Sequence, residues 1–310
     1  MTATIDPFIL EYAPGSLAEL DPAILRTRAE VTGFLDAMVQ VEDSSLLFQW
    51  FWQGNDINVR YAFYRALEAV SKAESAARIA LAGAPTSEAR EAAAATDAAR
   101  WDTHGLLVSL SDADLDADPG SGEWTVRQTM AHMISGQRGY AWGSAGWLSV
   151  RDQPRPEGPQ RLPEEMFKDL PEEDQEARGW LAEVRQQLGD IVDATSSRYA
   201  TLSDDEMAVR GGWYGFAITV GFRQWRWSSH ISEHTVQVEK TLDMLGKGQS
   251  EVARLTRLVA RAYGRLESVL FYRDGAAAAA PILDGLSAEL RGIRETVPAA
   301  VEAGVPANND

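Results

Sequence analysis

Three histidines are the residues of this chain best suited to metal chemistry. His132 lies eight residues after Trp124, and His230 and His234 form a His-x3-His pair. Side chains four residues apart on a helix lie on one face, with Cβ atoms about 5–6 Å apart. Two such imidazoles can reach one ion, and a third from a facing helix would complete a three-ligand site. Three protein ligands leave one position open, which is typical of catalytic metal sites.

The residues around the pair indicate that both histidines face inward. Trp227, Val238 and Leu245 lie with them on one line of three- and four-residue steps, and such apolar residues favour a core. Burying two imidazoles is costly unless their nitrogens are satisfied, and one metal ion could satisfy both. The alternative is that each histidine is separately hydrogen-bonded in the core or exposed to solvent.

Composition excludes several classes of partner and chemistry. The chain has 310 residues, of which 45% are hydrophobic, and a formal net charge of −17. This charge argues against nucleic acid and an anionic membrane surface, which attract clustered Lys and Arg. The lack of cysteine excludes disulfides, thiolate metal ligands and a cysteine nucleophile. With no basic leader and no run of about 18 apolar residues, we expect a cytoplasmic protein. The open position of the proposed metal site leads us to expect a small-molecule substrate.

The sequence predicts an all-α protein with eight helices. Apolar residues recur at helical steps, without the alternation typical of strands, in the ranges 22–42, 56–83, 87–111, 125–148, 175–202, 216–246, 250–273 and 281–297. We interpret 87–246 as a complete four-helix bundle. Residues 1–86 form a helical extension of two helices, and 247–300 hold two more that we expect to pack with them as a second bundle. Residues 301–310 are predicted to be a disordered tail.

Local signals fix two helix starts and one unusual connection. Thr125 and Gln128 match a capping box, which places His132 two turns inside a helix. Asp21-Pro22 is a second start, with an N-cap residue followed by proline. The proline-rich stretch 149–173 is too long for a simple antiparallel turn, so we expect a crossover or a lid over a site.

Two motifs together resemble the DinB-like family of metal-binding four-helix bundles. The first is Glu123-Trp-Thr-Val-Arg127 leading into Ala131-His132, and the second is His230-x2-Glu233-His234. The stretch from Leu106-Leu107 to Leu115-Asp116 is similar to that family as well. The resemblance covers residues 87–246. It implies an up-down-down-up bundle in which His132, His230 and His234 hold one divalent ion.

The same resemblance implies a cofactor. The superfamily includes mycothiol-dependent maleylpyruvate isomerases and S-transferases that use mycothiol or bacillithiol, in which the metal activates a small-molecule thiol. It therefore implies a low-molecular-weight thiol such as mycothiol, together with a homodimer, since bundles of this family often dimerise. We expect zinc, although Ni²⁺ and Fe²⁺ suit three imidazoles as well.

Other residues are weaker candidates. Glu233 could be a catalytic base or a hydrogen-bond partner of a histidine, and Arg127, Arg223 and Trp227 could bind a cofactor or an anionic substrate. His104 suits a pocket or a surface equally. Each has a structural alternative: a solvated helix face for Glu233, ion pairs for the arginines and core packing for Trp227.

Three functional hypotheses remain open at this point. The leading one is a metal-dependent thiol S-transferase or isomerase in which the ion activates a thiol. The second keeps the site but places water in the open position, which would make the protein a hydrolase. The third is a non-catalytic metal-binding or stress-response protein.

Overall fold

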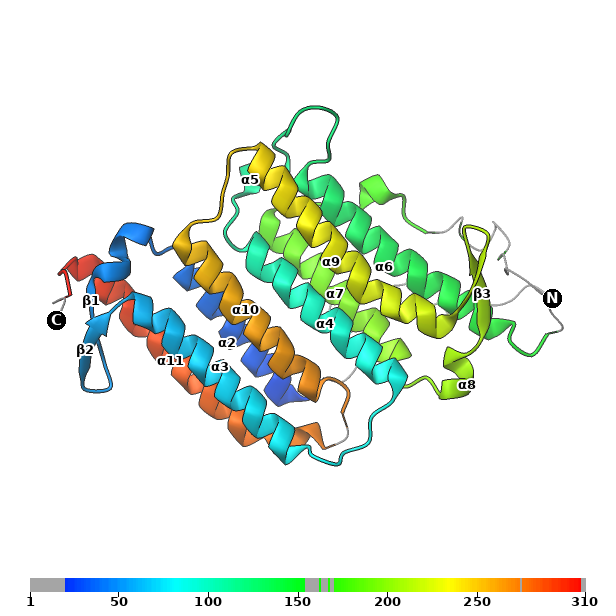
Figure 1. The fold of residues 1–310 in the computed structure, drawn as a ribbon, viewed down its shortest axis with the longest axis horizontal. Coiled ribbons are helices and arrows are strands. Elements are labelled where there is room, and N and C mark those ends of the chain that lie inside the picture. The colour runs from blue at the N-terminus through cyan, green and yellow to red at the C-terminus, as the bar shows by residue number, and fades with distance from the viewer. Residues whose placement is uncertain (1–19, 154–161, 163–166, 168–169, 274, 308–310) are drawn as a thin grey trace. The chain divides into compact units, whose positions relative to one another are not determined.

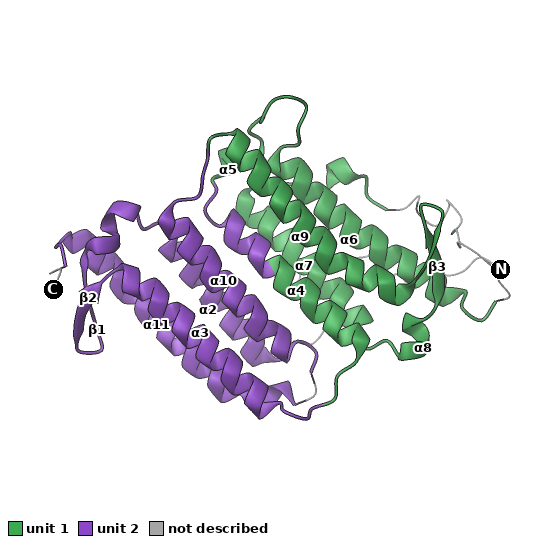
Figure 2. Ribbon diagram, viewed as in Figure 1, with its two compact units in different colours: residues 1–19, 85–100, 111–246 green, residues 20–84, 101–110, 247–310 purple. Residues whose placement is uncertain are grey.

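The chain folds into two compact helical units. The computed structural model describes residues 20–153, 162, 167, 170–273 and 275–307. The first unit contains residues 85–100 and 111–246, and the second contains 20–84, 101–110 and the chain from 247 onward (Figure 2). Helix α4 (Glu88–Leu107) contributes to both units, because the division falls between Arg100 and Trp101. This differs from the predicted domain 87–246, which included residues 101–110.

The first unit is a four-helix bundle, as expected for a DinB-like fold. The amino-terminal part of α4 lies beside three long helices (Figure 1), which are α6 (Val126–Ser149), α7 (Leu181–Tyr199) and α9 (Val220–Met244). Three short helical segments connect them, namely α5 (Asp112–Leu115), η3 (Glu173–Gln175) and α8 (Asp204–Met207). The predicted helical periods therefore correspond to real helices.

Hydrogen bonds define the helix directions in this bundle. Gln137 donates to Thr195, and Tyr199 donates to the Ala141 carbonyl, so α6 and α7 run in the same direction. Two parallel consecutive helices require a crossover, which is one of the two alternatives that the long 149–173 stretch predicted. Most of that stretch lies outside the described residues. Trp225 donates to Glu88, which places the starts of α9 and α4 together and gives an up-down-down-up order.

The register between α6 and α9 is fixed at the end that precedes His132. Thr125 caps α6 through the predicted box, in which Gln128 N donates to Thr125 Oγ1 and Thr125 N donates to Gln128 Oε1. Next to this cap, Thr241 of α9 donates to the Trp124 carbonyl at 2.9 Å. Lys240 also pairs with Glu123 at 2.6 Å. Because α9 runs antiparallel to α6, this register places the His-x3-His segment opposite His132.

The second unit is a bundle of α2 (Pro22–Met38), α3 (Arg60–Ala80), α10 (Glu251–Leu270) and α11 (Ala280–Ala303). As in the first bundle, the first and fourth helices are parallel, and so are the second and third. The pairs that show this are Thr27–Ser287 and Glu30–Arg291 for α2 and α11, and Arg60–Glu251 and Glu74–Arg265 for α3 and α10. The chain of the first bundle is thus inserted between the second and third helices of the other.

The all-α fold class is confirmed, but two short β-hairpins in the described residues were not predicted. Strands β1 (Gln49–Trp52) and β2 (Asn55–Asn58) pair antiparallel, as do β3 (Arg210–Trp213) and β4 (Phe216–Thr219). Each strand has only four residues, and each turn consists of one residue followed by glycine, both with positive φ. Strands this short carry too little alternation to be seen against helical periodicity.

The predicted disordered tail is also wrong for residues 301–307. Helix α11 continues to Ala303, and Phe48 forms a β-bridge with Pro306. Residues 308–310 lie outside the described part of the chain. No helix in the described ranges is long and apolar enough to cross a membrane.

A buried ion pair in the second bundle generates the first prediction. Arg28 Nε donates to Glu267 at 2.8 Å, and the Glu267 side chain is fully buried. Arg28→Ala should lower the free energy of unfolding by about 3–5 kcal/mol, because a buried carboxylate loses its cation. Urea unfolding followed by circular dichroism measures this.

Arg26 is the matched control on the same helix. It pairs with Asp284, and both side chains are about 60% exposed. Arg26→Ala should therefore cost less than about 1 kcal/mol. Equal losses from the two variants would contradict the structural role assigned to Arg28.

Candidate metal centre

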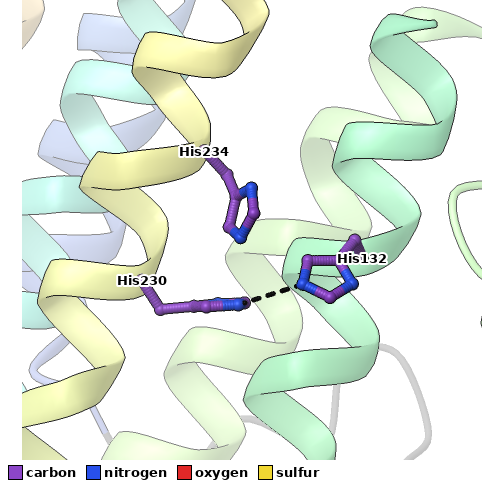
Figure 3. Close-up of side chains that lie close together, drawn as sticks. All are labelled: His132, His230 and His234. Carbon is purple, nitrogen blue, oxygen red and sulfur yellow. Dashed lines mark hydrogen bonds between the residues drawn. The ribbon is translucent and has the colours of Figure 1, made fainter. Parts of the chain in front are cut away.

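The three histidines of the sequence motif converge inside the first bundle. His132 projects from α6 toward His230 and His234 of α9 (Figure 3). The Nε2 atoms of His132 and His230 are 3.3 Å apart, and one ring nitrogen from each histidine lies within 4.8 Å of the others. The ring centroids of the three pairs are separated by 4.4–5.1 Å. Residues distant along the chain thus form one compact imidazole cluster.

Two of these rings are oriented by partners on their outer side. Nδ1 of His132 lies 2.9 Å from Glu173 Oε2, and Nδ1 of His234 lies 2.8 Å from Gln237 Oε1. Both partners are acceptors, so each Nδ1 carries the proton and each Nε2 keeps its lone pair. The Nε2 lone pairs therefore face the centre of the cluster, as metal-ligating histidines require.

The electrostatics of the cluster favour neutral imidazoles. His230 is 4% exposed, and burial, assisted by its neighbours His234 and His132, lowers its pKa to about 3. Burial also lowers the pKa of His234. Neutral imidazole is the form that binds metal, so these two histidines are ready to coordinate at neutral pH.

Close packing holds the cluster in position. A Cβ atom on Gly136 would lie 2.5 Å from Cε1 of His230, so only glycine lets this ring lie directly on α6. On the other side, the Trp124 ring lies over His132 and His234, with centroids 5.1 and 6.4 Å away. Trp124 thereby covers part of the cluster next to the helix cap that precedes it.

A second group of side chains lies beside the histidines. The Tyr140 ring contacts the His230 ring at 5.2 Å, and the Arg223 guanidinium lies 4.9 Å above the centroid of Tyr140. Arg223 is 7% exposed, and burial lowers its pKa to about 10. Arg223, a predicted binding residue, therefore lies one aromatic ring away from the metal ligands.

Comparison with known families agrees with this geometry. Residues 95–238 match the sequence profile of the DinB superfamily. The first bundle is therefore DinB-like over this segment. The matched segment includes α6, α7 and all three histidines of the DinB bundle. Searches of curated proteins and of solved structures returned no match to the chain.

The other predicted site residues have different surroundings. Arg127 donates to both Asp116 oxygens and to two carbonyls before α7, so it links the loops at one end of the DinB bundle. Glu233 forms two hydrogen bonds with Arg226, at 2.8 and 2.6 Å, and its side chain is 57% exposed. Glu233 was predicted as a possible hydrogen-bond partner of a histidine, but Glu173 and Gln237 are the partners of His132 and His234.

Trp227 and His104 also have surroundings that differ from those of the histidine cluster. Trp227 is fully buried against Tyr199, with ring centroids 5.3 Å apart, which is a core position rather than an accessible wall for a cofactor. His104 lies in the second unit, where its ring contacts Trp101. The structure therefore does not bring His104 to the histidine cluster.

Sequence reasoning missed four residues of the site: Trp124, Tyr140, Glu173 and Gln237. Gln237 follows His234 by three residues on the same helix face, which was a usable signal. Trp124 immediately precedes the N-cap, so its direction depended on the α6–α9 register. Glu173 lies at the end of the proline-rich connection, where no periodic pattern indicates direction.

The contact at Gly136 generates the second prediction. Gly136→Ala should displace the His230 ring and lower metal affinity on the order of tenfold or more, because ring orientation controls ligation. Isothermal titration with Zn²⁺ measures this affinity.

Gly139, three residues along α6, provides the control. A Cβ atom there meets nothing within 4 Å. Gly139→Ala should leave metal affinity unchanged and raise stability by about 0.5–1 kcal/mol, because alanine is the better helix former. If both variants bound Zn²⁺ like the wild type, the proposed packing of His230 would be wrong.

The depressed pKa of His230 generates the third prediction, for the metal-free protein. Unfolding restores the pKa of His230 from about 3 to the ordinary histidine value of 6.5, so the unfolded chain binds more protons than the folded chain between pH 3 and pH 6.5. The free energy of unfolding should therefore decrease as pH falls from 6.5 toward 3. Urea titrations across this range should show a shallower decrease for His230→Gln. Identical slopes for the variant and the wild type would contradict the assigned burial.

Proposed function

We propose that the DinB bundle binds one divalent metal ion through His132, His230 and His234 and serves as a thiol-dependent transferase or isomerase. One observation carries this proposal, namely the convergence of the three imidazoles with two outer nitrogens already held by acceptors. An isolated core histidine would need partners on both nitrogens. Here the inner nitrogens face one another instead.

One pair of the donor nitrogens has the spacing of two ligands of a tetrahedral ion. At zinc–nitrogen distances of about 2.0–2.1 Å, two tetrahedral ligands lie about 3.3–3.4 Å apart. The Nε2 atoms of His132 and His230 are separated by 3.3 Å. Three neutral nitrogen ligands, together with a chain that lacks cysteine, suit zinc and other borderline metals, including nickel and iron.

The chemistry follows from the open fourth position. A divalent ion held by the three histidines would supply Lewis acidity that lowers the pKa of a thiol in that open position, and this would give a nucleophile at neutral pH. Because this chain has no cysteine, the thiol has to come from a small molecule such as mycothiol. Addition of that sulfur to an electrophilic carbon of a second substrate is the reaction class that fits.

The surrounding residues hold protons and limit access of water. Glu173 keeps the Nδ1 proton of His132 on the outer side, so that Nε2 remains a ligand. Tyr140 keeps its phenolic proton at neutral pH because burial raises its pKa, and this phenol can donate to a substrate beside His230. Trp124 covers two of the rings from the opposite side.

Cobalt substitution tests the proposed use of a thiol. Co²⁺-loaded protein mixed with mycothiol or another small thiol should develop a sulfur-to-cobalt charge-transfer band. Thiol consumption should then exceed the buffer rate when an electrophile is added. Metal binding without either signal would contradict the thiol proposal and favour a hydrolase or a non-catalytic metal-binding protein.

The contact between Glu173 and His132 generates the fourth prediction. Glu173→Gln should weaken metal binding by about 10–100-fold, because the ligand loses a charged orienting partner. Glu172→Gln, one residue earlier and exposed, should bind metal like the wild type. Competition with a chromogenic chelator measures both affinities. Equal affinity of Glu173→Gln and the wild type would show that Glu173 does not orient His132.

A further inference from the structure

Arg223 is a buried cation that no carboxylate neutralises within the described part of the chain. Its side chain lies on α9 and is 7% exposed, and its Nε atom is buried without a hydrogen-bond partner. Arg226, one turn along the same helix, makes two hydrogen bonds to Glu233, so its charge is neutralised by a carboxylate. A buried charge without an opposite charge is costly, so its presence calls for a ligand.

Aromatic rings hold the Arg223 guanidinium in a defined orientation. Its Cζ lies 4.9 Å from the ring centroids of both Tyr140 and Trp147, and 5.8 Å from Trp213 of the β3–β4 hairpin. The hairpin packs directly on Trp147, because a Cβ atom on Gly211 would overlap that ring at 2.4 Å. Cation–π contacts fix the guanidinium without supplying a hydrogen-bond acceptor.

This arginine lies on the same helix face as the metal ligands. Arg223 and His230 are seven residues apart, which is close to two full turns and about 10 Å along the helix axis. Tyr140 contacts both side chains and spans the space between them. Tyr140 therefore connects the metal ligands with Arg223.

We infer that Arg223 is the anchor for a carboxylate on the substrate or thiol cofactor that the three-histidine centre processes. The inference rests on the proposed function and adds a substrate class: small molecules with a metal-binding group and a carboxylate about 10 Å apart. A guanidinium presents parallel N–H donors that match a carboxylate, and a single arginine balances a single negative charge. The chain's net charge of −17 disfavours polyanions such as nucleotides.

Two matched thiols test the anchor in the full-length, Co²⁺-loaded protein. The probes are 6-mercaptohexanoate and 6-mercaptohexan-1-ol, which differ in the terminal carboxylate. Dissociation constants come from the charge-transfer band and from tryptophan fluorescence, which responds at Trp147 and Trp213. The acid should bind at least about tenfold more tightly than the alcohol, because hydrogen bonds between two charged groups are strong enough to change a dissociation constant by that factor.

Variants assign this preference to Arg223. In Arg223→Met the preference for the acid should disappear, and in Arg223→Lys it should be reduced. Arg151→Gln is the control, because Arg151 belongs to the same unit but is paired with Glu206 at 2.9 Å. That variant should keep the full preference. Equal binding of acid and alcohol by the wild type would overturn the inference, as would a preference that persists in Arg223→Met.

Thermal melting separates the anchor from a purely structural role. Arg223→Met removes an unneutralised buried charge and keeps an unbranched side chain of similar reach, so its melting temperature should equal or exceed that of the wild type. A clear decrease would assign Arg223 to structural packing and overturn the inference.

Failure of the anchor and failure of the proposed function give different results. If no thiol produces a cobalt band but the acid still changes tryptophan fluorescence in an Arg223-dependent way, the thiol proposal fails and the anchor stands. If both thiols produce the band with equal affinity, the metal–thiol chemistry stands and the anchor is overturned. If neither signal appears, both are overturned.

Discussion

The close approach of α6 and α9 at Gly136 is the constraint on which the site depends. It lets the His230 imidazole lie on the backbone of α6, so that its Nε2 meets that of His132. The hydrogen bond from Thr241 to the Trp124 carbonyl fixes the register of α9 against α6, and this register produces the contact at Gly136. Burial keeps His230 neutral, and the outer partners of the other two rings leave lone pairs facing a common point. A cation at that point would give the inward-facing ring nitrogens the partner that side-chain packing does not provide.

Much of this arrangement could be predicted from the sequence because it depends on local periodicity. The i, i+4 spacing placed His230 and His234 on one face, and the apolar residues on the same line turned that face inward. The capping box at Thr125 fixed the phase of α6 and hence of His132. The up-down-down-up helix order was implied by the family resemblance, and the length of the 149–173 connection agreed with it because parallel neighbours need a long connection. Each of these signals depends on the spacing of a few neighbouring residues or on the length of a segment, and both can be read from a single sequence.

The remaining features depend on register between distant segments. Glu173 reaches His132 from an irregular connection, and Tyr140 lies between His230 and Arg223 only because α6 and α9 run antiparallel at this register. The β3–β4 hairpin brings Trp213 to Arg223 through strands too short for a periodic signal. The sequence left Trp227 open as a core or a binding residue because an inward helix line includes both kinds of position, and the packing of Trp227 against Tyr199 favours the core.

Native mass spectrometry after equilibration with Zn²⁺ tests the central claim most directly, because it counts ions per chain. The account predicts one bound ion for the wild type and for His104→Ala, whose histidine lies in the second unit. It also predicts loss of that ion in each of His132→Ala, His230→Ala and His234→Ala. Retention of the ion in any of these three variants, or its loss in His104→Ala, would contradict the claim that these imidazoles share one metal.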